Sequence, residues 1–267
     1  MNNANKTGVE TLSEPKTLYR YYAFNEHTEK IFKENEIYFA SPDQYADLSD
    51  SKICWVCEGT YQEKEIYLNN LYLKKCPDWS EEKRVSFIKK LLTDKDHGDD
   101  FQQIIKGSGE RIRRRLGIYC LTEKKDNILM WVHYAYRHSG FCLEFDINNG
   151  FFGLYTRAIK VEYETKLPII NVLHLENVPK GELGTKLVIK ATDWKYEQEW
   201  RIVDTKGSGI HHFPEEALIG VILGNKISPK NKENVLKWCK LRKYPPTIYE
   251  AKEKEKEFGL DIVKIDY

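Results

Sequence analysis

The sequence predicts a single α+β domain over residues 17–267, preceded by a flexible leader over residues 1–16. Two observations predict this class. Many short apolar or alternating segments read as strands, with a few helical segments between them. No internal repeat or low-complexity linker divides the chain. With 267 residues, 41% of them hydrophobic, the chain is long enough to bury a sizeable core.

The first elements follow from alternation and from capping residues. Residues 18–24 alternate and are rich in aromatics, which predicts the first strand. Asn25 is a natural N-cap for a short helix, and Asn35 can end that helix in a left-handed conformation. Residues 36–40 then read as a second strand, closed by Ser41 and Pro42.

Helices are expected where capping residues precede an apolar stripe. Ser80 caps a helix whose stripe includes Ile88 and Leu91, and Ser228 with Pro229 begins another. Residues 93–110 look loop-rich or weakly helical, and residues 126–136 read as a short helix. The remaining expected elements are a helix around 182–190 and strands at 117–121, 140–145, 158–163, 196–204, 218–223, 247–251 and 261–265.

The overall charge gives no reason to expect nucleic acid or a membrane as a partner, since 42 basic residues face 41 acidic ones. No apolar window is long enough to span a bilayer and no signal core opens the chain, so we expect a cytoplasmic protein. Cys54 and Cys57 form one C-x-x-C, with only Cys76 nearby, so no metal site is expected. The arginines between 111 and 115 read either as a solvated helix end or as a phosphate-binding patch.

The run from Tyr196 to Ile202 is the most informative segment. On a strand, Glu197 and Glu199 would share a face with Arg201. Two carboxylates in one place repel unless a cation or a substrate hydroxyl meets them. The run therefore indicates either a ligand site or an edge strand whose solvated face is neutralised by Arg201.

Two further segments carry polar groups on predicted strands. Arg20 shares a face with Leu18 and Tyr22, where an arginine either pairs with a carboxylate such as Glu197 or Glu199 or binds a phosphate. Ser41 ends the second strand, where its hydroxyl either meets a ligand or starts the next turn.

Aromatic and histidine residues are dense between residues 126 and 142. Helical spacing would place Trp131, Tyr134 and His138 on one face, with His133 on the neighbouring face. Such a mixture suits a flat heteroaromatic ligand, although a single tryptophan or histidine is more often part of a core.

Together these segments resemble a bacterial family of unknown function, DUF2971. The resemblance rests on Tyr19-Arg20-Tyr21, Phe39 to Pro42, Leu129 to Tyr134 with His138-Ser139-Gly140, and Trp194 with Tyr196 to Arg201. It covers roughly residues 18–225. The sequence departs from the family after Ser-Pro, where Tyr45 to Leu48 replaces the usual Asn-Asp-Pro.

The order of the motifs also resembles the ADP-ribosyltransferases, which clamp NAD on a split antiparallel β-core. That resemblance implies that Glu199 is catalytic and that Glu197 orients or deprotonates the acceptor. It makes Arg20 the contact for the NAD phosphates or adenine-side ribose, with Ser41 supporting the site. Tyr134 or Trp131 would stack on nicotinamide. The remaining residues assigned to NAD binding are Tyr21, His133 and His138.

The chemistry suits these residues, because a carboxylate stabilises the oxocarbenium-like transition state of nicotinamide loss. The implied protein is a toxin-like effector of toxin–antitoxin or anti-phage systems. Its acceptor would be nucleic acid or protein, and its partner a neutralising protein. The alternatives are an NAD glycohydrolase and a non-catalytic binding module, with a glycoside hydrolase or a metal-dependent nuclease ranking below them.

Overall fold

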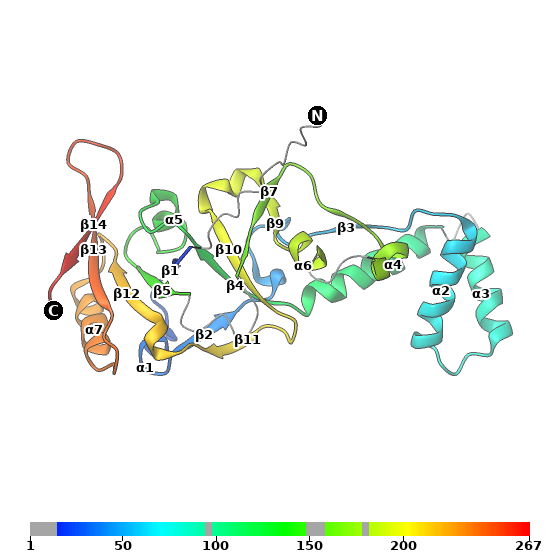
Figure 1. Cartoon of the computed structure of the whole chain (residues 1–267), viewed down its shortest axis with the longest axis horizontal. Coiled ribbons are helices and arrows are strands. Elements are labelled where there is room, and N and C mark those ends of the chain that lie inside the picture. The colour runs from blue at the N-terminus through cyan, green and yellow to red at the C-terminus, as the bar shows by residue number, and fades with distance from the viewer. Residues whose placement is uncertain (1–14, 94–97, 148–157, 178–181) are drawn as a thin grey trace, which may run out of the picture. The chain divides into compact units, whose positions relative to one another are not determined.

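The computed structural model describes residues 15–93, 98–147, 158–177 and 182–267 (Figure 1). The fold is mixed α/β, and most of its strand pairs are antiparallel. Contacts divide the chain into two compact units. Unit 1 comprises Met1–Asn35, Thr122–Phe152 and Phe213–Tyr267, and unit 2 comprises Glu36–Leu121 and Gly153–His212.

Unit 1 contains a mostly antiparallel sheet whose strand order is β14-β13-β12-β5-β1. Only β12 and β13 are parallel, and helix α7 connects them, since parallel neighbours need a crossover. The strands are β1 (Thr17–Tyr22), β5 (Phe141–Asp146), β12 (Leu218–Leu223), β13 (Thr247–Glu253) and β14 (Leu260–Ile265). The helices are α1 (Thr28–Lys33), α5 (Ile128–His133), the 3-10 turn η5 (Glu215–Ala217) and α7 (Pro229–Lys240).

Aromatic packing fills the core of unit 1. Phe141 is fully buried, and its ring lies 5.5 Å from that of Tyr22 and 5.0 Å from that of Phe24. Phe32 of α1 also stacks on Trp238 of α7 at 5.6 Å, which joins the two helices. Offset aromatic contacts of this kind add to the free energy of burial itself.

Unit 2 contains helices and several short strand pairs. The helices are α2 (Tyr61–Lys75), α3 (Glu81–Thr93), α4 (Gly98–Arg114) and α6 (Glu182–Lys186), with 3-10 turns η1 (Pro42–Gln44), η3 (Val172–Asn177) and η4 (Thr192–Glu197). The strands are β2 (Glu36–Phe39), β3 (Cys54–Val56), β4 (Gly117–Thr122), β6 (Ile159–Lys160), β7 (Glu162–Glu164), β8 (Ile169–Asn171), β9 (Ile189–Ala191), β10 (Glu199–Asp204) and β11 (Gly209–His212).

The strands of unit 2 pair in four groups. Strands β4, β10 and β6 lie in that order, with β10 antiparallel to β6. Strands β2 and β11 form an antiparallel pair, whereas β3–β8 and β7–β9 are parallel pairs. In the two parallel pairs, β3 lies beside β8 and β7 lies beside β9, although the paired strands are not consecutive in the sequence.

Several expected elements are confirmed with small shifts. The strand expected at 218–223 is β12, and Asn35 ends α1 in the left-handed region with φ 56°. The Ser228 side chain accepts a hydrogen bond from Asn231 N and caps α7. The strand expected at 158–163 is two short strands, β6 and β7, and the helix expected at 126–136 is shorter, because it ends at His133.

Of the two alternatives for residues 93–110, loop-rich or weakly helical, the structure shows a helix, because α4 runs from Gly98 to Arg114. Glycines at 107 and 109 lower the helix propensity of this segment. At Gly109, however, an added Cβ would lie only 1.9 Å from Trp55 Nε1. The glycine is therefore needed for the close approach of Trp55, and tertiary packing outweighs its low helix propensity.

Helix α2 was not expected, although its N-terminus has a capping box. The Thr60 hydroxyl accepts from Glu63 N at 3.2 Å, and the Glu63 carboxylate accepts from Thr60 N at 2.7 Å. Only Leu68 and Tyr72 of this helix are buried, so its apolar stripe is weak in the sequence. The helix is held by packing on α3, where Arg84 Nε donates to Asn69 Oδ1 at 2.7 Å.

Candidate functional site: a buried charge network

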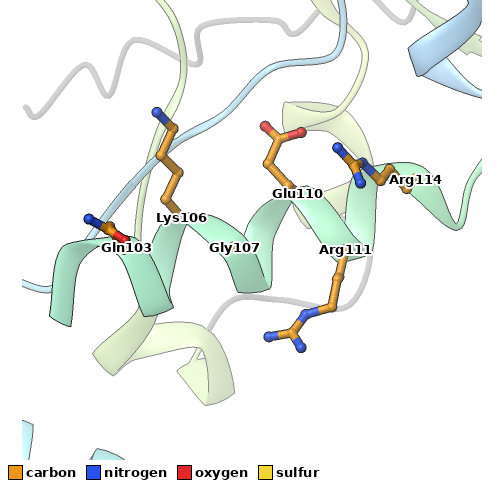
Figure 2. Close-up of a pocket in the computed structure, with 6 residues that line it drawn as sticks. All are labelled: Gln103, Lys106, Gly107, Glu110, Arg111 and Arg114. Carbon is orange, nitrogen blue, oxygen red and sulfur yellow. The ribbon is translucent and has the colours of Figure 1, made fainter. Parts of the chain in front are cut away.

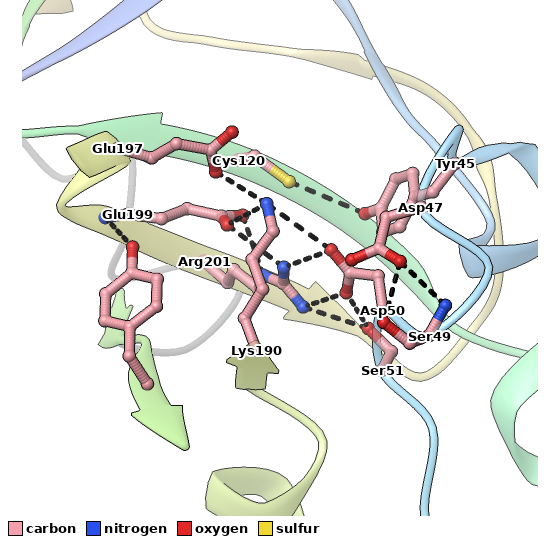
Figure 3. A network of polar contacts seen from close by, with 11 residues as sticks. Tyr45, Asp47, Ser49, Asp50, Ser51, Cys120, Lys190, Glu197, Glu199 and Arg201 are labelled. Atoms are coloured by element: carbon pink, nitrogen blue, oxygen red, sulfur yellow. Dashed lines mark hydrogen bonds and ion pairs between the residues drawn. The ribbon is translucent and has the colours of Figure 1, made fainter. Parts of the chain in front are cut away.

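Five charged side chains meet in the interior of unit 2 (Figure 3). Lys190 comes from β9, Glu197 from the end of η4, and Glu199 and Arg201 from β10. Asp50 comes from the segment between η1 and β3. Each of the five is at most 8% exposed, and Arg201 is 0% exposed. Charged groups are rarely this buried unless they are paired.

Local backbone geometry brings the two glutamates to the same lysine. Glu199 and Arg201 share a face of β10, as the two-residue spacing predicts. Glu197 does not lie on that strand, so the expectation of one strand over 196–204 is wrong. Gln198 between the glutamates is left-handed, with φ 44° and ψ 53°, and this turn separates η4 from β10.

Arg201 is the centre of the network. Its Nη1 and Nη2 donate to the two Asp50 oxygens at 2.7 and 2.8 Å, a bidentate pair. Its Nε and Nη2 donate to the Glu199 oxygens at 2.7 and 3.0 Å, and Nη1 also donates to Ser51 Oγ at 2.9 Å. One guanidinium therefore joins two carboxylates and a hydroxyl.

Lys190 is the second cation. Its ammonium donates to Glu197 Oε2 at 2.5 Å and to Glu199 Oε2 at 3.0 Å, and it lies 3.5 Å from Asp50 Oδ2. Its Nζ also lies 5.0 Å from the centre of the Trp194 ring. Three carboxylates (Asp50, Glu197, Glu199) thus face two cations, so these five side chains carry one excess negative formal charge.

These contacts shift the titration of the network. Burial alone would raise the pKa of Glu199, but Arg201 and Lys190 outweigh it and lower that pKa well below its usual range. Burial opposes the charged form of Lys190 as well, yet Glu199, Glu197 and Asp50 together raise its pKa. Both groups are therefore held in their charged forms at neutral pH.

Aromatic side chains border the network. The Tyr163 hydroxyl accepts a hydrogen bond from Glu199 N at 2.9 Å, and burial raises the pKa of Tyr163 to about 12. The Tyr45 ring lies 5.9 Å from the Arg201 guanidinium, and its hydroxyl contacts Cys120 Sγ at 3.5 Å.

Ser41 also lies in unit 2, and its backbone begins the turn η1. Its N–H donates to Gln44 Oε1 at 2.9 Å, and its carbonyl accepts from Gln44 N at 2.9 Å. These hydrogen bonds are those of a residue that starts a turn, which was one of the two alternatives predicted for Ser41, the other being contact with a ligand.

The other predicted site residues belong to unit 1. Arg20 lies on β1 opposite Leu143, with its guanidinium 5.7 Å from the centre of the Tyr22 ring. Tyr21 is buried, and its hydroxyl donates to Lys124 O at 2.8 Å. Its ring meets that of Trp131 edge-on at 5.1 Å.

Trp131 and His138 come together, but the expectation that one helix face carries both of them with Tyr134 is wrong, because α5 ends at His133. Their rings stack at 6.1 Å with an interplanar angle of 8°. Trp131 is 0% exposed, and its Nε1 donates to Lys125 O at 3.0 Å. Burial and Lys226 lower the pKa of His138. Trp131 therefore has no exposed ring face for a ligand.

Tyr134 and His133 lie at the end of α5 and are more accessible. Tyr134 is 37% exposed, and its ring is 6.4 Å from that of His133. The chain then passes through three consecutive left-handed residues, Tyr136, Arg137 and His138, with φ of 45°, 55° and 69°. Of the two candidates for stacking on nicotinamide, Tyr134 is the one with exposed surface.

The sequence did not single out Asp50, Ser51 or Lys190. Asp50 and Ser51 lie in a polar segment that reads as an ordinary turn. Lys190 lies on β9 and follows the apolar run Leu187-Val188-Ile189, and a lysine inside an apolar segment is rarely buried unless it is paired.

A comparison with family models bears directly on the segment that carries this site. Residues 130–202 match the family described as Protein of unknown function (DUF2971). The expected resemblance to that family is confirmed for this segment. It begins inside α5 and ends inside β10, so it includes Lys190, Glu197, Glu199 and Arg201. No curated protein and no solved structure matches the chain significantly.

The described residues contain neither a metal-binding cluster nor a membrane-spanning helix. Among them, no three His, Cys, Asp or Glu side chains are grouped so that they could hold a metal ion. None of the helices in the described part of the chain is long and apolar enough to cross a membrane.

Proposed function

We propose that this protein is an NAD-dependent ADP-ribosyltransferase whose reactive carboxylates are Glu199 and Glu197. The observation that carries the proposal is the excess negative charge of the network, where three carboxylates face two cations. A network with one excess negative formal charge favours a cationic ligand, and the positive charge of the nicotinamide ring of NAD moves onto the ribose at the transition state.

In the proposed reaction, the bond between nicotinamide and ribose C1′ breaks, and neutral nicotinamide leaves with the bonding electrons. Glu199, kept ionised by Arg201 and Lys190, stabilises the positive charge that develops on the ribose. A hydroxyl or amine of the acceptor attacks C1′ and gives its proton to Glu197. Water as the acceptor would make the protein an NAD glycohydrolase.

The proposal requires one carboxylate oxygen to become available to the ribose. Lys190 is the group that would release it, because a lysine ammonium sits on a flexible stem and is less constrained than the bidentate guanidinium of Arg201. Arg201 and Asp50 would keep their contact during the reaction. Lys190 would therefore control access to Glu197 and Glu199.

The test is nicotinamide release from NAD by the purified protein and by the variant Glu199→Gln, with and without RNA, DNA and cell extract. The variant Glu162→Gln, at an exposed position on β7, is the matched control. We expect release by the wild type and the control but not by Glu199→Gln. Folded wild-type protein that releases no nicotinamide under any of these conditions would rule the proposal out.

A second candidate function is a non-catalytic binding module, and one specific observation favours it. The two oxygens of Glu199 already accept three hydrogen bonds, from Lys190 and from two Arg201 nitrogens. A carboxylate saturated in this way is typical of a structural ion network. On this candidate, Glu199→Gln lowers the melting temperature by several degrees and NAD is never consumed.

The roles implied for Arg20, Ser41, Tyr21, Trp131, His133, Tyr134 and His138 stay predictions, to be tested one residue at a time by NAD turnover. We further propose that the protein acts in the cytoplasm as a toxin-like effector that a neutralising protein restrains. Expression in a bacterial host would test this. Growth arrest by the wild type that Glu199→Gln abolishes would support it, whereas arrest that persists in the variant would contradict it.

A further inference from the structure

A cavity of about 780 Å³ lies beside α4 in unit 2, and among the described residues that line it there is none of the five charged residues of the network. Strand β3 and the segment before it contribute Lys52 and Trp55, and α4 contributes Lys106, Glu110 and Arg113. The helix residues stand at four- and three-residue spacing, so they share one face of α4. The volume is in the range of sites that hold ordinary small-molecule ligands.

A smaller hollow of about 360 Å³ adjoins it and shares Lys106 and Glu110. Arg111 and Arg114 add their charges to this hollow. Figure 2 shows Lys106, Glu110 and Arg114 on one side of α4, with Arg111 projecting from the other. The two hollows together make a basic surface along α4.

The positive charge of the larger cavity exceeds its negative charge. Lys52, Lys106 and Arg113 line it, against Glu110 alone. Arg113 is held by Glu110, at 3.0 Å, and by Asp43. Within the described residues, no ion pair is found for the side chains of Lys52 and Lys106. Two lysines and a fixed arginine therefore face the cavity.

Two positive charges lie near each other where α2 ends, one from α2 and one from α4. The pKa of Lys75, at the end of α2, is lowered by partial burial and then by the nearby charge of Arg111. Crowded cations gain stability when an anion binds among them.

Trp55 supplies an aromatic wall. Its indole packs against Gly109 of α4, where an added Cβ would lie 1.9 Å from Nε1, so the ring is held in place by the helix backbone. A fixed aromatic ring beside cations is the combination that binds a base by stacking and its phosphate by charge.

We propose that this cavity binds a nucleotide, with the phosphate on Lys52, Lys106 and Arg113 and the base against Trp55. The source is either a free mononucleotide or one unit of a single-stranded nucleic acid. Arg113 is suited to the phosphate because Glu110 and Asp43 orient its planar fork. The proposal stands apart from NAD turnover, since binding is measured without any reaction.

Cys54 provides the measurement, because it lines the cavity and is exposed. Burial raises the pKa of Cys57 to about 11 and that of Cys239 to about 12, so these thiols react slowly. The rate of Cys54 alkylation by iodoacetamide is followed by mass spectrometry, and Cys54→Ser identifies its contribution. The probes are AMP, ATP, inorganic phosphate and a single-stranded RNA of about ten nucleotides.

We expect nucleotides to slow the alkylation of Cys54 in a saturable manner. Protection by AMP or ATP indicates a mononucleotide site, whereas protection by RNA alone, weakened by salt, indicates a single strand. Both outcomes support the proposal. Protection by inorganic phosphate at the same concentration as AMP would overturn the role of Trp55, and no protection by any probe would overturn the site.

Lys106→Ala tests the charge contact, and Lys89→Ala on α3 is the matched control, because both lysines are exposed and lose one charge. We expect Lys106→Ala to weaken protection about tenfold, the loss of one charge-assisted contact, and Lys89→Ala to leave it unchanged. Equal effects of the two variants would show that binding is non-specific and would contradict the proposed site.

Discussion

The aromatic cluster of unit 1 and the charge network of unit 2 are held together by different chemistry, although unit 2 has apolar clusters as well. In unit 1, Phe141 packs among aromatic rings from β1 and α1, and its contacts are non-directional. In unit 2, Arg201 makes five hydrogen bonds whose donors and acceptors are fixed in direction. An apolar core tolerates changes of similar volume, whereas a buried ion network fails when one partner is lost. The charge network of unit 2 is therefore more sensitive to the loss of one side chain than the aromatic cluster of unit 1.

The largest effect is expected from Arg201→Met, which keeps the volume but removes the charge. The variant leaves Asp50 and Glu199 buried without their main partner, so unfolding should become easier by about 3–5 kcal/mol. Denaturant titration at pH 7 measures this. Lys195→Met, exposed on η4, is the control. A loss below about 1 kcal/mol for Arg201→Met would show that the charge network contributes no more to stability than an exposed ion pair, which would contradict the comparison.

The matching change in unit 1 is Leu143→Ala on β5, at a fully buried position. Loss of the side chain and the cavity left behind should cost about 2–5 kcal/mol. Because no charge is involved, the loss should be the same at pH 5 and pH 8. Denaturant titration at both values measures it, with Val263→Ala on β14 as the more exposed control. A loss that changes with pH would blur the distinction between the units.

Acid should remove the contribution that the charge network makes to the stability of the protein. The folded-state pKa of Glu199 is lowered from 4.5, so its contribution to stability is present above about pH 4.5 and is lost as the pH falls below it. Thermal melts from pH 7 to pH 2 should show this fall in the wild type and in Leu143→Ala. They should show a smaller fall in Arg201→Met, where Glu199 has lost the partner that depresses its pKa. Parallel profiles for all three proteins would contradict the assignment.

The smallest effect is expected at the start of α5. Asn127 Oδ1 accepts from Leu129 N at 2.9 Å and from Met130 N at 3.2 Å, an N-cap contact. Asn127→Ala should cost about 1 kcal/mol, and Asn127→Ser should restore most of it. Thermal melts of the two variants measure the difference. Equal losses in both would mean that packing of Trp131, rather than the cap, fixes this helix.

The sequence predicted what local patterns determine. The apolar run of β12, the left-handed Asn35 and the cap at Ser228 were all expected, because each depends on residues within a few positions. Helix α4 was expected only as a weakly helical alternative to a loop, because its glycine at 109 is explained by Trp55, which is distant in the sequence.

The candidate site, like the fold, was predicted only where it depends on local spacing. The spacing of Glu199 and Arg201 correctly placed them on one strand face. Their partners Asp50 and Lys190 come from other segments, which no periodicity links to β10. The turn at Gln198 was also missed, because a left-handed glutamine has no local signature comparable to glycine.

The pairing of Asp50 with Arg201 has a consequence for the order of events as the chain is made. The two residues are 151 positions apart, so Asp50 is synthesised long before its partner exists. Contacts between distant residues form late and slow the folding of the chain that contains them. Until Arg201 has been synthesised, Asp50 stays hydrated and the interior of unit 2 cannot close around it. Formation of β10, which carries Arg201, is therefore the step that completes the interior of unit 2.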